Sequence, residues 1–308
     1  MRNQDIIELT FNLTWYCPVK CEYCYRARIS DNTKLEILSE SHLKRECLKA
    51  KELGIKHYRF SGGEPISIGD QLFDYADIVY EITDCKPALL TSGYLITDAW
   101  LNKAKNKFSS IAISVDNPLK YEKSKKILAL IKENTSEELP LTYGVTLIEA
   151  EYFDKIYDIF GYMYDYVERK FMPQMDYNCL QNYVQPTDNQ LNSLIENTKK
   201  IIEQYGLPPY YFVYLIGSPL WIDEDIQRYV LNLHPEGNYQ IYDDMKERLD
   251  VEYRWRNYIL QQQMHSQLCL SCDWIEVCKH HPLWDIRYDW CSLRKALFEG
   301  ILQGLKNE

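Results

Sequence analysis

The sequence predicts an α/β fold, an open partial barrel of six strand–helix units followed by a smaller cysteine-rich extension. Between residues 6 and 205, short runs of alternating apolar residues give way repeatedly to apolar residues at helical spacing. Six such units suit an incomplete barrel better than a closed eightfold one, and ligands bind these folds at the carboxyl ends of the strands. The alternation stops at Leu207-Pro208-Pro209. We therefore expect a barrel over 1–206 and an extension over 207–308.

The elements follow in order. Alternating residues from Ile7 to Leu13 predict the first strand, and Ser39 or Ser41 can cap a first helix that ends at Gly54. Further strands are expected near 57–60, 88–91, 110–115, 141–148 and 170–175. Further helices are expected near 71–83, 97–106, 119–133, 152–166, 187–206 and 243–263, with a last one after Cys291. Thr187 and Gln190 have the spacing of a capping box.

Composition narrows the class of protein. With 46% hydrophobic and 26% charged residues, the 308-residue chain is typical of globular proteins. Its net charge of -10 has the wrong sign for nucleic acid as the main partner. The chain has neither a signal peptide nor an apolar run long enough for a membrane span, so we expect a cytoplasmic protein. Its ten cysteines then point to metal or cofactor ligands before disulfides.

The first cysteine set is Cys17, Cys21 and Cys24, in a C-x3-C-x2-C spacing just after the first strand. Three thiolates can hold three irons of a 4Fe–4S cluster and leave the fourth iron open. Zinc is the alternative, but structural zinc requires four ligands, and the loop holds no fourth cysteine or histidine.

This spacing, with Tyr23 before the last cysteine, resembles the signature of the radical S-adenosylmethionine (radical SAM) superfamily. Three later segments resemble further motifs of that family over about residues 5–205: a GGE(P) motif at 61–65, a T-N-G turn at 91–93 with Ser for Asn, and an S-x-D segment at 114–116. The resemblance assigns S-adenosylmethionine binding to Tyr23, Ser61, Gly62, Gly63, Glu64, Pro65, Thr91, Ser92, Ser114 and Asp116.

The resemblance also implies a reaction. The cluster would bind S-adenosylmethionine, and one electron would cleave it to methionine and a 5'-deoxyadenosyl radical that abstracts hydrogen from a substrate. The GGE(P) motif would meet the amino group of the methionine moiety, with Glu64 offering acceptors to the ammonium and the glycines allowing the backbone to approach the ligand.

The second cysteine set is Cys269, Cys272 and Cys278, in a C-x2-C-x5-C spacing, with Cys291 further on. Four thiolates also describe a structural zinc site. Beside the first motif, the spacing resembles SPASM/Twitch extensions and implies one auxiliary 4Fe–4S cluster. Pro282 stands where such extensions usually have another cysteine, and His280 or His281 could replace Cys291 as the fourth ligand.

The remaining cysteines stand alone. Cys47 lies on the apolar face of its helix and is expected in the core, whereas Cys85 has no assignable role. Cys179 follows the sixth predicted strand; it is either a thiol without a role or a donor of a hydrogen atom to a substrate radical, as in peptide epimerases of the family.

We expect a radical SAM oxidoreductase that modifies a ribosomally made peptide by crosslinking, oxidation or epimerisation. The 26 tyrosines suit a peptide-binding surface, although ordinary packing explains them equally well. Two alternatives remain: an enzyme that acts on a small metabolite such as an aminosugar or nucleoside, and a zinc-stabilised interaction protein without turnover. The expected partners are a flavodoxin-like or ferredoxin-like electron donor and, because the chain begins at its first strand, a separate leader-peptide-binding protein.

Overall fold

The computed structural model describes residues 6–19, 21, 35–143, 146–147, 150–166, 175–176, 186–206, 229–233 and 290–306. The chain divides into two compact units. The first comprises Met1–Val115, Lys123–Gly144 and Arg228–Glu247, and the second Asp116–Glu122, Val145–Gln227 and Arg248–Glu308. The domain boundary expected at residue 206 adjoins residues outside the described part and stays a prediction.

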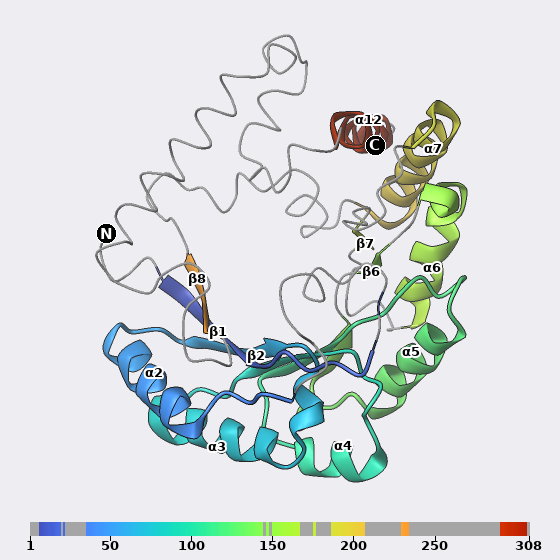
Figure 1. Cartoon of the computed structure of the whole chain (residues 1–308). Coiled ribbons are helices and arrows are strands. Elements are labelled where there is room, and N and C mark those ends of the chain that lie inside the picture. Colours follow the sequence, from blue (N-terminus) through green and yellow to red (C-terminus); the bar gives the residue numbers. More distant parts are fainter. Residues whose placement is uncertain are drawn as a thin grey trace. The chain divides into compact units, whose positions relative to one another are not determined.

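The first unit is built on a six-stranded sheet in the order β5-β4-β3-β2-β1-β8 (Figure 1). All five strand pairs are parallel. The strands are β1 (Ile6–Thr14), β2 (His57–Gly62), β3 (Ala88–Thr91), β4 (Ser110–Ile113), β5 (Leu141–Tyr143) and β8 (Tyr229–Leu233). The helices between them are α2 (Glu40–Glu52), the short η2 (Pro65–Ile68), α3 (Gln71–Thr83), α4 (Asp98–Ala104) and α5 (Glu122–Asn134). This confirms the predicted α/β class with a parallel sheet.

The apolar core lies between the sheet and the helices on one of its faces (Figure 1). Phe11 on β1 meets Phe60 on β2 edge to face, with ring centroids 6.0 Å apart. The aromatic contacts continue through Phe108 to Phe73 on α3, at centroid distances of 6.5 and 6.3 Å. Because side chains alternate along a strand, the residues between the apolar ones on β1, which are Thr10, Asn12 and Thr14, lie on the opposite face. They are buried as well.

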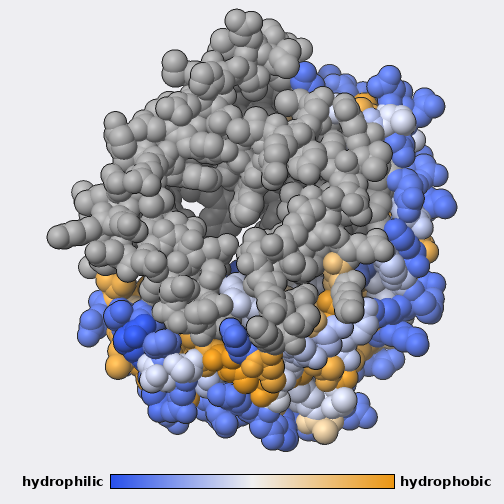
Figure 2. Space-filling model, in the orientation of Figure 1, coloured by the Kyte–Doolittle hydropathy of each residue, from blue (hydrophilic) through white to orange (hydrophobic). Residues whose placement is uncertain are grey.

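The helices begin and end where the capping residues predict. Ser39 caps α2, because its side chain accepts a hydrogen bond from the backbone N–H of His42, and Gly54 follows the helix with φ +76°. α3 has the bounds expected from the sequence. Charged and polar residues dominate the described surface in Figure 2, with smaller apolar areas between them. No helix in the described residues is long and apolar enough to cross a membrane.

The second unit contains a small parallel pair, β6 (Thr146–Leu147) with β7 (Met175–Asp176), and a group of helices. These are η3 (Ala150–Lys155), α6 (Ile156–Tyr166), α7 (Asp188–Tyr205) and α12 (Trp290–Leu305). The predicted capping box at Thr187 and Gln190 is present at the start of α7.

Helices α7 and α12 pack at very short range (Figure 1). A Cβ on Gly300 would lie 2.7 Å from the backbone oxygen of Ile195, and one on Gly304 would lie 2.7 Å from the Cβ of Ile202. Two glycines four residues apart on α12 therefore allow this close contact.

Two details of the sheet differ from the expectation. The strand expected over 141–148 is divided into β5 and β6, which belong to different sheets, and β8 was not expected at all. β8 pairs with the free edge of β1, although its residues lie in the segment assigned to the extension. Its five residues are too few for their pattern to separate a strand from a loop. The closed form of the barrel and the extension stay predictions, and the helix expected near 243–263 lies outside the described residues.

Candidate active site

The predicted motifs meet at the carboxyl edge of the sheet. The cysteine loop follows β1, Gly63 and Glu64 follow β2, and Ser92 follows β3. Since these three strands are parallel neighbours, their carboxyl ends lie side by side. This is the edge at which ligands bind in α/β folds of this kind.

Backbone contacts join the end of β2 to the start of the cysteine loop. Gly63 N donates to Thr14 O at 2.6 Å, and Glu64 N donates to Tyr16 O at 2.8 Å. A Cβ on Gly62 would lie 2.4 Å from Thr14 O, and one on Gly63 would lie 2.2 Å from Tyr16 O. Both glycines are thus required for the contact between these two protein segments. Their predicted role, the close approach of the backbone to a ligand, stays a prediction.

Glu64 is fully buried, and its carboxylate is the centre of a hydrogen-bond network. One oxygen accepts from Ile66 N at 3.1 Å and from Thr91 Oγ1 at 2.6 Å. The other accepts from Ser92 N at 2.8 Å and from the Ser92 hydroxyl. Four donors use the acceptor capacity of a carboxylate. Glu64 therefore ties the turn after β3 to the end of β2, whereas its expected contact with an ammonium stays a prediction.

Serine suits the place that asparagine takes in the family motif. Ser92 offers Glu64 both its backbone N–H and its hydroxyl, and the next residue, Gly93, adopts φ +75°. A Cβ on Gly93 would lie 2.5 Å from the side chain of Ile113. The turn is therefore fixed from both sides, by Glu64 and by the core below it.

Cys17 and Cys21 are half-buried thiols at the start of the predicted cluster loop. Cys17 Sγ donates to Val19 O at 3.4 Å. Thiols are the ligands that iron–sulfur clusters require, so this pair fits the cluster. Cys24 and Tyr23 lie outside the described residues, and within the described ranges no three potential metal ligands come together. The three-cysteine cluster site stays a prediction.

The fourth predicted motif is described in part. Ser114 is exposed after β4, and its N–H donates to Thr91 O at 2.8 Å, which brings it to the same edge. Asp116 belongs to the second unit and is half-buried. Pro65 opens η2 and is buried. Ser61 is 8% exposed and is the register partner of Asn12 on β1.

A lysine that the sequence analysis missed lies at this edge. Lys123, near the start of α5, holds its Nζ 2.8 Å from the centroid of the Tyr94 ring. Burial lowers the pKa of Lys123 to about 8, and attraction to Cys21, Glu64 and Cys17 opposes that shift. The only sequence signal was a lysine a few residues after the S-x-D segment.

The face of the sheet opposite helices α2, α3 and α4 carries a polar row that the sequence analysis also missed. Arg59 pairs with Glu8 at 2.7 Å, and the Thr10 hydroxyl donates to the same carboxylate at 3.0 Å. Asn12 is fully buried, yet neither atom of its amide, nor Nε of Arg59, has a hydrogen-bond partner among the described residues. The polar residues that alternate with apolar ones along the first strand were the sequence signal for this row.

Several predicted residues are not tested. Cys179, Cys269, Cys272 and Cys278 lie outside the described residues, and Cys291 lies in α12 without a described side chain. Their roles stay predictions. The expected core position of Cys47 is confirmed, since it is fully buried and burial raises the pKa of its thiol to about 12.

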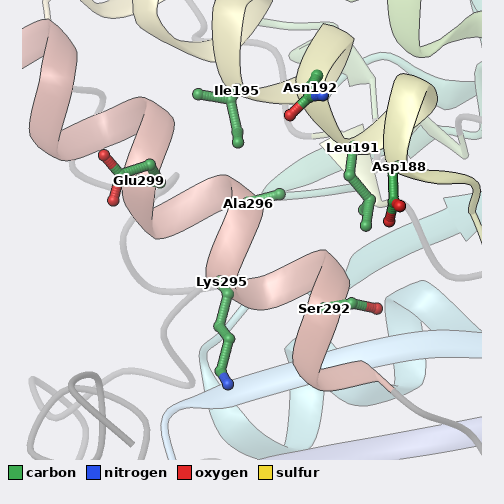
Figure 3. Close-up of a pocket in the computed structure, with 8 residues that line it drawn as sticks. All are labelled: Asp188, Leu191, Asn192, Ile195, Ser292, Lys295, Ala296 and Glu299. Carbon is green, nitrogen blue, oxygen red and sulfur yellow. The ribbon is translucent and has the colours of Figure 1, made fainter.

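A separate hollow of about 490 Å³ lies between α7 and α12 in the second unit (Figure 3). Its lining mixes charges of both signs, from Asp188, Lys295 and Glu299, with apolar side chains. None of the predicted site residues lines it.

Known proteins resemble this chain in sequence. A GTP 3',8-cyclase from Clostridium perfringens (strain SM101 / Type A) is 24% identical over 213 residues, which is 65% of each chain. A probable GTP 3',8-cyclase from Methanothermobacter marburgensis is 31% identical over 95 residues, 31% of this chain and 30% of the relative. The matched segments therefore span less than two thirds of these relatives.

Solved structures share the fold. Native anSMEcpe with bound AdoMet and Cp18Cys peptide matches with a TM-score of 0.66 at 16% identity, covering 98% of both chains. Streptococcus suis SuiB bound to S-adenosylmethionine matches with a TM-score of 0.53 at 17% identity, covering 90% of this chain and 70% of SuiB.

The sequence profile of the Radical SAM superfamily matches residues 11–141, which include the cysteine loop, Glu64, Ser92 and Lys123. This agrees with the resemblance found in the motifs and with the parallel sheet. The match to the Radical SAM superfamily therefore covers residues 11–141, the part of the chain that holds most of the candidate site.

Proposed function

We propose that this chain is a radical SAM enzyme that abstracts hydrogen from its substrate at the carboxyl edge of the sheet. The observation that carries this proposal is the Glu64 network, because it joins the segments after β2 and β3 beside the loop of Cys17 and Cys21. When bound, a 4Fe–4S cluster would supply the electron that cleaves S-adenosylmethionine.

The protein's own residues would hold and orient these groups. Cys17, Cys21 and Cys24 would hold the cluster, with Tyr23 beside them. The backbone at Gly63 and Glu64 would face the methionine part of S-adenosylmethionine, and Ser114 and Asp116 its ribose or carboxylate. The rigid connection from Thr14 to Gly63 would keep the two binding segments in register, which is the main contribution a protein makes when it positions reactants.

We further propose a peptide as the substrate. The polar row on the sheet is neutral: Glu8 pairs with Arg59, Thr10 adds a hydroxyl, and the buried amide of Asn12 has no hydrogen-bond partner among the described residues. A buried amide without partners is costly, and a substrate amide satisfies both its donor and its acceptor. The fold similarity to anSMEcpe, solved with a peptide, supports this choice.

The finer parts of the proposal follow the same line. Cys269, Cys272, Cys278 and Cys291 would bind one auxiliary 4Fe–4S cluster in a SPASM/Twitch-like segment, and Cys179 would return a hydrogen atom. A flavodoxin-like or ferredoxin-like protein would supply electrons, and a separate protein would present the leader of the peptide.

A nucleotide substrate is the second candidate, because the relatives found by sequence are GTP 3',8-cyclases. A triphosphate requires several unpaired cations. Arg59 is already paired with Glu8, and a single lysine such as Lys123 would not neutralise a triphosphate. We therefore rank the peptide first.

Anaerobic reconstitution with iron and sulfide, followed by dithionite and S-adenosylmethionine, tests the reaction. We expect a brown protein that forms 5'-deoxyadenosine, and a Cys24→Ala variant that does not. Colourless protein that binds zinc and cleaves nothing would refute the proposal. GTP and a peptide encoded beside the gene are then compared as substrates by the 5'-deoxyadenosine that each elicits.

The auxiliary cluster is tested by iron counting on a Cys291→Ala variant. Loss of auxiliary-cluster signals would support Cys291 as a ligand. Unchanged iron content and spectra would remove it from the ligand set.

A further inference from the structure

Lys123 carries a half-buried positive charge at the carboxyl edge of the sheet. Its ammonium lies over the ring of Tyr94, 2.8 Å from the centroid, and it forms no ion pair with any residue of the described ranges. The face of an aromatic ring attracts a cation but carries no net charge to neutralise it. A partly buried ammonium in such a place requires an anion nearby.

The position of this charge is fixed by the turn after β3. Tyr94 follows Ser92 directly after Gly93, and its N–H donates to the Ser92 hydroxyl at 3.5 Å. Gly93 also lies against α5, since a Cβ there would meet the side chain of Ile127 at 3.8 Å. Both elements that hold Lys123 therefore belong to the carboxyl edge of the sheet.

The negative charge of Glu64 is one of the charges that attract Lys123. Its carboxylate already accepts four hydrogen bonds from Ile66, Thr91 and Ser92. The other anionic groups that act on Lys123 are the thiolates of Cys21 and Cys17. When these cysteines hold a cluster, each added electron would increase the negative charge that attracts the lysine.

We propose that the positive charge of Lys123 stabilises the reduced state of the cluster held by Cys17 and Cys21. It would thereby raise the reduction potential of that cluster. This rests on the proposed radical SAM function. Net charge near a cluster is one of the properties that set its potential. The ring of Tyr94 contacts the ammonium.

The test is a redox titration of the reconstituted protein, followed by electron paramagnetic resonance in the absence of S-adenosylmethionine. For one charge within about 10 Å of another at an effective dielectric constant of about 20, removal changes the equilibrium constant for reduction by about tenfold. Lys123→Met should therefore lower the midpoint potential by about 59 mV, which is a tenfold change for one electron. The Lys123→Arg variant keeps the positive charge and should therefore have the wild-type midpoint potential.

Lys126 gives the matched control, since it lies on α5 three residues after Lys123 and is exposed. The Lys126→Met variant should have the same reduction potential as the wild-type protein. Equal potentials for Lys123→Met and wild type would overturn the proposal. So would a variant whose potential is unchanged but whose affinity for S-adenosylmethionine falls in equilibrium dialysis, because the lysine would then bind the ligand's carboxylate.

The design separates this proposal from the one on which it rests. If wild-type protein assembles no cluster, the radical SAM function fails and the role of Lys123 fails with it. If wild-type protein assembles a cluster and forms 5'-deoxyadenosine, but substitution of Lys123 does not change the reduction potential, only the role of the lysine is refuted.

Discussion

The substitution Glu64→Gln tests whether the buried carboxylate holds the site together. A glutamine side chain has nearly the same shape, but an NH₂ group replaces one of the two oxygens. In this structure one oxygen accepts from Ile66 N and the other from Ser92 N. The hydroxyls of Thr91 and Ser92 can rotate, whereas the two backbone N–H groups cannot. In either orientation of the amide, one backbone N–H therefore faces another donor.

The expected loss follows from this geometry. A hydrogen bond to a charged group contributes about 1.5–3 kcal/mol, and a buried donor left without a partner costs about 1–3 kcal/mol. Both ranges describe the loss of the same hydrogen bond, so they are not added. We therefore expect Glu64→Gln to lower the free energy of unfolding of the first unit by about 2–3 kcal/mol. That is a large part of the 5–15 kcal/mol typical of a domain.

Urea unfolding of the metal-free protein, followed by circular dichroism and tryptophan fluorescence, measures the effect. Glu52→Gln at the exposed end of α2 is the control and should change stability by less than about 0.5 kcal/mol. If the two variants unfold at the same urea concentration, the Glu64 network does not stabilise the fold, and our account of the site is wrong.

Further substitutions test neighbouring features. Gly63→Ala should reduce both stability and iron content, because its Cβ would lie 2.2 Å from a backbone oxygen; Gly54→Ala, with φ +76° and open space, should cost only about 1–2 kcal/mol and leave iron content unchanged. Thr187→Ala should remove the capping box of α7 and destabilise by about 1 kcal/mol, measured by thermal unfolding and contradicted by an unchanged melting temperature. Because burial raises the pKa of Cys47 to about 12, its thiol should resist iodoacetamide at pH 8 and react only after unfolding, as mass spectrometry would show; rapid labelling of the folded protein would disprove this.

Several elements of both units could be predicted from local signals. The apolar alternation over Ile7–Leu13 and the caps at Ser39 and Thr187 depend on neighbours in the sequence, and the structure has them as expected. The burial of Cys47 followed in the same way from the spacing of apolar residues on its helix.

What the sequence could not predict depends on contacts between distant segments. Three of the four donors around Glu64 come from a turn 27 and 28 residues away, so no local pattern reveals that its carboxylate is already satisfied. Lys123 reads as one of several lysines at a helix start, and only the fold brings it to Tyr94. β8 was missed because five residues carry too weak a pattern, although they complete the sheet beside β1.

The pairing of β1 with β8 has a consequence for biosynthesis. β1 receives β2 as a neighbour soon after it leaves the ribosome, but its other neighbour comes from Tyr229–Leu233. Until that segment emerges, one edge of β1 presents unpaired backbone groups that can recruit other chains. Contacts so distant in sequence also form slowly. Nascent chains that stop between Gly206 and Tyr229 should therefore be more prone to aggregate than chains that include β8.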